Sequence, residues 1–213
     1  MTFIGLDLET SGTDINRGAV PIQLGLAHKD PDGLMSWRSS MIGEWEWCKF
    51  DHEWHASMTD CDKPSWSIKA EAIHGLLQER VDRSPNPWWA STGGADTIEK
   101  WCYDVPRIGR HIVGFNVAGF DLPFVRRYMR ELADSLSYRT VDLNAVLFAI
   151  DQAWIPSPSG GRWKYKTLKK VVKEAAAEKA ATHFDGEVRW HDAAFDAVAA
   201  LYVWDDLVRI IRR

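Results

Sequence analysis

Two acidic residues stand two positions apart near the start of the chain, within residues 1–11 (MTFIGLDLETS). The apolar residues around them predict a buried strand, whose alternation places the Asp7 and Glu9 side chains on the same face. Two carboxylates held this close repel each other, so the pair requires a neutralising cation. Carboxylate oxygens are preferred by hard cations, and the sequence therefore predicts a site for Mg²⁺ or Mn²⁺.

A third acidic residue, Asp121, follows the next predicted strand at residues 110–115 (RHIVGF). Pro123 is tolerated in the first turn of a helix, so Asp121 is expected close to a helix N-terminus just beyond the carboxyl end of a strand. Functional carboxylates commonly lie there in α/β sheets. The alternative is that Asp121 only caps the helix.

The C-terminal segment predicts a long helix with one buried face, because apolar residues recur at spacings of three and four from position 197 to position 211. Asp192 can cap this helix, and Asp196 lies at the edge of the buried face near its start. His191 precedes Asp196 by five residues, about 140° away on a regular helix at ~100° per residue. We therefore expect His191 in a loop or irregular first turn, leaning over the same site.

The elements that must position these residues alternate between strands and helices. Period-two alternation between turn signals predicts strands, and spacing of three and four with capping residues predicts helices. The predicted strands beyond the first are 19–28, 34–38, 110–115 and 137–141, and the predicted helices before the last are 67–77, 95–105, 143–154 and 167–181. On the helix at 167–181, Lys169, Lys170 and Lys173 are expected to point mostly outward.

Composition limits the class of protein. The chain has 213 residues, 46% of them hydrophobic, which predicts one well-buried domain. It lacks an apolar run close to the ~20 residues of a membrane span. Acidic residues interrupt the apolar N-terminal run, which is therefore not typical of a signal peptide. Three cysteines, an odd number, argue against an oxidised secreted scaffold. A soluble, cytoplasmic protein without a membrane partner is expected.

The charge of the chain restricts how it could bind nucleic acid. A formal net charge of −4 provides no global positive field, so such a partner would be held by a local patch or by bound metal. Residues 155–166 (IPSPSGGRWKYK) end in three cations interleaved with two aromatic residues. This mixture suits a phosphate backbone with a stacked base, although a solvated basic loop is equally common.

One segment, residues 39–66, has no sustained period and holds four of the twelve tryptophans. It is expected to be an insertion or a long loop packed on the domain. A zinc site is conceivable within it, but the spacing C-x3-H-x2-H-x5-C matches no established motif, so loop residues without metal are favoured. The residues concerned are Cys48, His52, His55 and Cys61.

Three motifs in this order resemble the DEDDh exonuclease family, the DnaQ-like group of 3′-to-5′ nucleases. They are DLETSG at 7–12, VGFNVAGFD at 113–121 and HDAAFDA at 191–197. IHGL at 73–76 and TLKKV at 167–171 are lesser matches. The resemblance covers most of the chain and leaves the Trp-rich segment unmatched. It implies a single domain over residues 1–213 with a ribonuclease H-like α/β fold, a mixed sheet of about five strands with helices on both faces.

The resemblance also implies roles for individual residues. Four carboxylates match the metal ligands: Asp7, Glu9, Asp121 and Asp196. His191 matches the general base. The branch of the family that uses tyrosine places it four residues before the last Asp, where this chain has Asp192, so the histidine branch is the better match. The supporting positions that contact substrate are matched by Thr10, His74, Asn116 and Phe120.

These residue types also suit phosphodiester hydrolysis on chemical grounds. Two divalent ions, Mg²⁺ or substituting Mn²⁺, can activate a water and stabilise the leaving oxygen, and a histidine can accept the proton of the water near neutral pH. The predicted function is a 3′-to-5′ exonuclease that acts on single-stranded 3′ ends, DNA in preference to RNA, and releases nucleoside 5′-monophosphates. A role in DNA replication or repair would involve a polymerase or other replication protein as partner.

Two alternatives remain open from the sequence. One is an oligoribonuclease-like enzyme acting on RNA, because no motif identifies a contact to the 2′-hydroxyl. The other is a nuclease fold used only as a nucleic-acid-binding or assembly module. Against the second stands the presence of all five motif residues, which binding alone does not need.

Overall fold

The computed structural model describes residues 2–30, 32–41, 67–76, 110–136 and 139–212. Most of the expected Trp-rich insertion at 39–66, all four candidate zinc ligands and the expected helix at 95–105 lie outside these residues. None of the described helices is long and apolar enough to cross a membrane.

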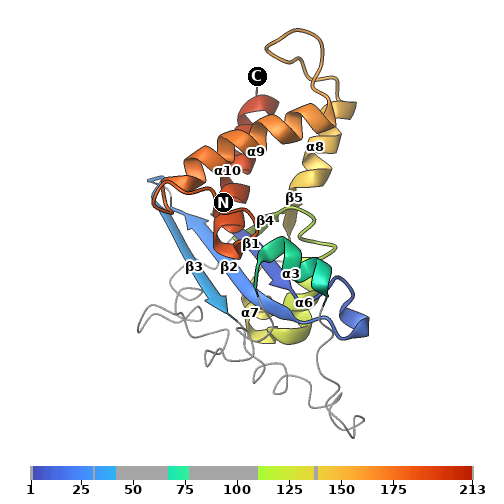
Figure 1. Cartoon of the computed structure of the whole chain (residues 1–213). Helices are drawn as coiled ribbons and strands as arrows, with labels where there is room; N and C mark the ends of the chain where they lie inside the picture. The colour runs from blue at the N-terminus through green and yellow to red at the C-terminus, as the bar shows by residue number, and fades with distance from the viewer. Residues whose placement is uncertain (1, 31, 42–66, 77–109, 137–138, 213) are drawn as a thin grey trace, which may run out of the picture.

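The described strands form one mixed sheet in the order β3-β2-β1-β4-β5 (Figure 1). Strands β1, β2 and β3 are an antiparallel meander, while β4 and β5 run parallel to β1. The sheet and its helices confirm the predicted α/β fold of ribonuclease H-like type. Its strands are β1 (Thr2–Thr10), β2 (Pro21–Lys29), β3 (Met35–Met41), β4 (Arg110–Gly114) and β5 (Thr140–Asp142).

Strand bounds differ from the prediction at two places. β3 continues three residues beyond the expected end at Arg38, into the start of the segment expected to be an insertion, because it pairs with β2 as far as Gln23↔Met41. β5 is short and ends at Asp142, whose carboxylate caps the next helix by accepting from the backbone N–H of Asn144 at 2.9 Å. One residue therefore ends the strand and starts the helix.

Three of the described α-helices, α3, α8 and α10, begin at residues that the sequence marks as caps. Ser67 caps α3, which ends at Gly75 in the left-handed conformation, and Asp192 caps α10. The helix expected at 167–181 starts two residues earlier. The described helices are α3 (Ile68–His74), α6 (Asp121–Tyr128), α7 (Arg130–Ser135), α8 (Leu143–Gln152), α9 (Tyr165–Ala181) and α10 (Ala193–Ile211), with a short 3-10 helix, η1 (Ile15–Arg17).

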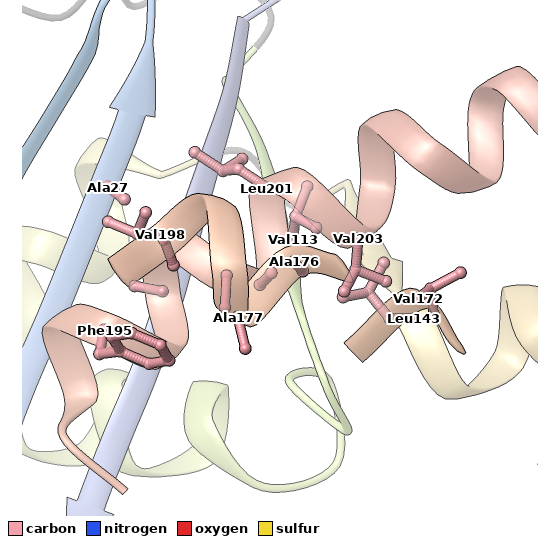
Figure 2. Close-up of a cluster of buried hydrophobic side chains, with 14 of the residues drawn as sticks. Ala27, Val113, Leu143, Val172, Ala176, Ala177, Phe195, Val198, Leu201 and Val203 are labelled. Carbon is pink, nitrogen blue, oxygen red and sulfur yellow. The ribbon is translucent and has the colours of Figure 1, made fainter. Parts of the chain in front are cut away.

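Two hydrophobic clusters cover the two faces of the sheet. Ile4, Leu6 and Leu8 on β1 face a cluster that includes residues of α6 and α7. The second cluster joins α8, α9 and α10 to the other face (Figure 1). In Figure 2, Val172, Ala176 and Ala177 of α9 lie beside Val198, Leu201 and Val203 of α10.

The first half of α10 is buried more completely than expected. The sequence predicted one buried face, whereas Ala193, Phe195, Val198 and Ala199 are all buried although they point in different directions around the helix. The reason is that α10 packs between the sheet and α9, so both of its sides are covered. Alanine occupies five of the seven buried positions between 193 and 200, and its small side chain allows this central packing.

Two glycines let α10 lie directly against the sheet. A Cβ atom at Gly5 would collide with the carbonyl oxygen of Ala197, and one at Gly25 with the carbonyl group of Ala193. Both glycines lie on the face of the sheet that also carries Asp7, since Asp7 pairs with Gly25. The close approach of helix and strand therefore sets the distance between the carboxylates of β1 and the start of α10.

We expect Gly25→Ala to lower the free energy of unfolding by about 2–3 kcal/mol, because the added methyl group must push α10 away from the sheet. Urea unfolding monitored by circular dichroism measures this change. Gly12→Ala is the matched control, since a Cβ there would make only ordinary contacts with Ala19 at 3.5 Å. Equal stability of the Gly25→Ala and wild-type proteins would contradict the proposed close packing.

Candidate active site

The end of β1 presents two carboxylates beyond the reach of its parallel neighbour. β1 pairs with β4 only from Thr2↔Arg110 to Gly5↔Val113. Asp7 and Glu9 come later in the strand, opposite Gly25 and Gln23 of β2. Because side chains alternate along a strand, both carboxylates lie on the face of Gly5, which is covered by α10. The predicted shared face of this pair is confirmed.

Asp121 takes the place that a continued β4 would have occupied. After β4 the chain turns through Asn116, which has a positive φ of 60°, and α6 begins at Asp121. The Asp121 side chain is 2% exposed, and its Oδ1 accepts a hydrogen bond from the backbone N–H of Leu8 at 2.9 Å. The alternative interpretation as a simple cap is not borne out, because Phe120 occupies the N-cap position of α6 without a side-chain cap hydrogen bond.

Asp196 enters the site from the first turn of α10. Its Oδ2 accepts a hydrogen bond from the backbone N–H of His191 at 3.0 Å. Its Oδ1 is buried and accepts no hydrogen bond from the described part of the chain. His191 itself is exposed and lies two residues before the helix with a φ of 68°, as expected for an irregular turn. Asp196 therefore holds the histidine backbone with one oxygen and leaves the other available.

Side-chain atoms from two of these segments converge closely. Potential ligand atoms of Glu9, His191 and Asp196 all lie within 4.8 Å of one another. Asp7 and Asp121 are outside this tightest group, but the Asp121, Asp196 and Glu9 charges all act on Asp7. The structure thus brings together all five residues that the motifs indicated.

Burial and the neighbouring negative charges raise the pKa values of these four carboxyl groups. Burial is the largest cause in each case, and it raises the pKa of Glu9 to about 8, with the charges of Asp196 and Asp121 adding to the effect. The pKa of Asp121 rises to about 7 and that of Asp196 to about 6, each lowered again in part by the backbone N–H that it accepts. Burial likewise raises the pKa of Asp7 well above its ordinary value.

The donor set fits hard divalent cations. The four carboxylates offer only oxygen ligands; Glu9 and Asp121 are buried, and Asp7 and Asp196 are half-buried. Positive charge among them would restore their ordinary ionisation. The unpartnered Oδ1 of Asp196 is the atom whose chemistry most requires a cation. The residues that would hold the ions are Asp7, Glu9, Asp121 and Asp196.

The four predicted supporting residues lie at the ends of elements that lead to the acidic residues. Thr10 is buried and its hydroxyl donates to the carbonyl oxygen of Gly12 at 2.7 Å, so it shapes the end of β1. His74 ends α3, interacts with the Thr10 backbone and has its pKa lowered, first by burial. Asn116 forms the turn after β4, and Phe120 packs on Phe124 with ring centroids 5.4 Å apart.

Two polar neighbours of the candidate site were not predicted from the sequence. Gln23 accepts a hydrogen bond from the backbone N–H of Ala193 at 3.3 Å through its Oε1, which ties β2 to the start of α10. The sequence feature that could have indicated Gln23 is that it is a polar residue within an otherwise apolar buried strand. Lys173 was expected to point outward, yet it is half-buried and its charge acts on Asp7 and Asp196. The sequence feature that could have indicated Lys173 is its position next to Val172, which belongs to the apolar face of the helix.

The sheet and its helices define a ribonuclease H-like fold, which this chain shares with solved exonucleases. Exonuclease I of E. coli in complex with a dA16 oligonucleotide matches 98% of the chain with a TM-score of 0.54 and 16% identity. Cell-death related nuclease 4 also matches 98% of the chain, with a TM-score of 0.53 and 13% identity, over 64% of its own length. The chain spans about 40% of the length of the exonuclease I chain.

A sequence relative is an oligoribonuclease from Mannheimia succiniciproducens, which is 28% identical over 181 residues. The match covers 84% of this chain and 89% of that protein. No family model matches the chain.

We expect the metal-free protein to lose stability as the pH rises from about 4 to about 8. The folded carboxyl groups, with pKa values raised to about 8, 7 and 6, keep protons that the unfolded chain has already lost. This contribution is complete below the unfolded pKa values near 4 and disappears as each folded pKa is passed. One pKa unit corresponds to about 1.4 kcal/mol, so the smallest of these shifts, that of Asp196 from 3.8 to about 6, should by itself lower the free energy of unfolding by about 3 kcal/mol.

Urea unfolding in EDTA at pH 5 and at pH 8 measures this difference, and a parallel series in Mg²⁺ should restore the stability lost at pH 8. Glu9→Gln is the comparison variant, since it removes one titrating group and should flatten the pH dependence. A metal-free protein that gains stability between pH 5 and pH 8 would show that these carboxyl groups are not destabilised in the folded state.

Proposed function

We propose that this protein is a divalent-metal-dependent 3′-to-5′ exonuclease of the DnaQ-like group, acting on single-stranded nucleic acid and releasing nucleoside 5′-monophosphates. The observation that carries the proposal is the convergence of buried and half-buried carboxylates from β1, α6 and α10 beside His191. The 28% identity to an oligoribonuclease and the fold shared with exonuclease I support it.

The chain provides the parts that phosphodiester hydrolysis needs. Bound Mg²⁺ ions would lower the pKa of the attacking water and stabilise charge on the leaving oxygen. Asp7, Glu9, Asp121 and Asp196 would hold those ions. The hydrogen bonds from Leu8 to Asp121 and from His191 to Asp196 fix two of the four carboxylates in place. The backbone therefore positions the acidic groups before substrate arrives.

His191 is the proposed general base, which would assign the protein to the DEDDh branch. Its pKa is lowered from 6.5, first by burial and then by the Lys173 charge, so its ring is neutral and able to accept a proton at pH 7. Its exposure at the rim of the site leaves the ring accessible to a water molecule. Its backbone N–H donates a hydrogen bond to Asp196, so the proposed base is held beside one of the proposed metal ligands.

The proposal states the end of the strand at which hydrolysis starts, but it does not state whether the strand is DNA or RNA. DNA as preferred substrate remains a prediction. The oligoribonuclease relative favours a second candidate, an exonuclease that degrades short RNA. Recognition of the 2′-hydroxyl would distinguish the two.

The function is tested with 5′-labelled oligonucleotides of DNA and of RNA, each in a short and a long form. With Mg²⁺ or Mn²⁺, we expect a ladder that shortens one nucleotide at a time from the 3′ end, and no reaction in EDTA. A 3′-phosphorylated oligonucleotide serves as a control for attack at a free 3′ end. Absence of metal-dependent hydrolysis on both DNA and RNA would refute the proposal, and binding without hydrolysis would favour a binding module.

A further inference from the structure

One lysine on α9 lies at the mouth of the acidic site. The Nζ atom of Lys173 is 4.1 Å from the ring centroid of Trp190 and 5.1 Å from that of Phe115. Trp190 directly precedes His191, and Phe115 directly follows β4. The two rings therefore hold the ammonium group between the segment that carries His191 and the segment that leads to Asp121.

Packing explains why Lys173 faces this way. Val172 and Ala176 on the same helix are buried against the cluster shared with α10, as Figure 2 shows. Lys173 follows Val172 at the edge of this buried stripe, so its stem is half-buried and its ammonium group reaches the start of α10. Lys170, on the outer side of the same helix, is exposed and pairs instead with Glu174 at 3.8 Å.

Lys173 forms no ion pair with the described part of the chain. No described carboxylate lies within 4.0 Å of its Nζ, whereas Lys29 and Lys179 are paired with Asp205 and Asp206 at 2.6 and 2.8 Å. Lys173 nevertheless acts on Asp7, Asp196 and His191, since its charge lowers the pKa of all three. It is a positive group that faces the site and leaves its donors available.

Charge balance indicates what those donors would bind. On the proposed function, four carboxylates and two divalent cations neutralise each other, so the filled site offers a phosphodiester no net positive charge. A strand arriving at the site brings one negative charge at each phosphate. Among the described cations, Lys173 carries a charge that acts on both Asp7 and Asp196.

We propose that Lys173 binds the phosphate group of the 3′-terminal nucleotide, donating a hydrogen bond from Nζ to a non-bridging oxygen. The inference rests on the proposed function and adds a substrate-binding residue to it. Trp190 and Phe115 position the lysine by cation–π contact. The recognised chemistry is a nucleoside 5′-phosphate, either as part of the strand or as the released product.

The test compares Lys173→Met with Lys170→Met in the full-length protein with saturating Mg²⁺. Isothermal titration calorimetry measures the affinity for adenosine and deoxyadenosine 5′-monophosphates and for the two nucleosides without phosphate. Loss of one charge-assisted hydrogen bond should weaken binding of the monophosphates by about 10- to 100-fold and leave nucleoside binding unchanged. Lys170→Met should change neither, and kcat/KM on a labelled strand should fall only in Lys173→Met.

Further measurements separate phosphate binding from a structural or metal-related role. Lys173→Arg keeps the charge and should retain most monophosphate affinity, and Lys173→Gln replaces Lys173→Met if that variant does not fold. An unchanged monophosphate affinity, an equal loss for nucleosides, or a loss explained by weaker Mg²⁺ binding would each overturn the inference. In those outcomes the wild type still hydrolyses the strand; a wild-type protein without hydrolysis would refute the proposed function itself.

Discussion

Replacing Asp7 with Asn is expected to reduce kcat about a thousand-fold or more and, at the same time, to stabilise the metal-free protein. The loss of activity follows because a neutral amide cannot hold a divalent cation as a carboxylate does, and bound metal supplies several kcal/mol of transition-state stabilisation. The gain in stability follows because Asp7 is desolvated and surrounded by the like charges of Asp121, Asp196 and Glu9.

Opposite effects on activity and stability distinguish a ligand from a packing residue. Single-turnover hydrolysis of a labelled strand measures the first effect, and thermal unfolding in EDTA at pH 8 measures the second. Asp185→Asn is the matched control, because Asp185 is exposed and its φ of 54° is one that Asn tolerates. An Asp7→Asn protein that is both less stable and less active would indicate a structural role for this carboxylate.

Replacing His191 with Ala is expected to reduce kcat by about 10²- to 10⁴-fold while leaving Mg²⁺ affinity within a few-fold of wild type. The reason is that, in the proposed function, the four carboxylates hold the metal, whereas the ring accepts a proton. The hydrogen bond to Asp196 comes from the backbone N–H of His191, so removing the side chain leaves that contact in place. The fall in rate at acidic pH that protonation of this ring would cause should be absent from the His191→Ala variant.

Mg²⁺ titration of the inactive variant decides between the two roles open to this residue. A ligand atom of His191 lies within 4.8 Å of ligand atoms of Glu9 and Asp196, so the ring could also bind metal. A large loss of Mg²⁺ affinity would show that His191 is a ligand and not simply a base. His183→Ala, which removes a histidine bonded to Tyr202 at 2.8 Å, is the control for a general effect of losing an imidazole.

The order of the motifs and the local elements that carry them could be predicted from the sequence. The strand with Asp7 and Glu9, the helix starting near Asp121 and the cap at Asp192 all depend on short-range rules: alternation, proline in a first turn, and side-chain capping. These rules involve residues only a few positions apart, so the residues themselves are sufficient evidence. The resemblance to a nuclease family indicated that the segments belong together.

The tertiary structure decided how closely they meet. Gly5 and Gly25 allow α10 to lie against β1 and β2, and Asp121 bonds Leu8, which is 113 positions away in the chain. Lys173 was assigned to the outer side of its helix because periodicity along one helix cannot show what packs beside it. The identity of the five candidate site residues is a property of the sequence. The raised pKa values of the four carboxyl groups, the lowered pKa of His191 and the position of Lys173 beside them arise from burial, which depends on how the elements of the fold pack.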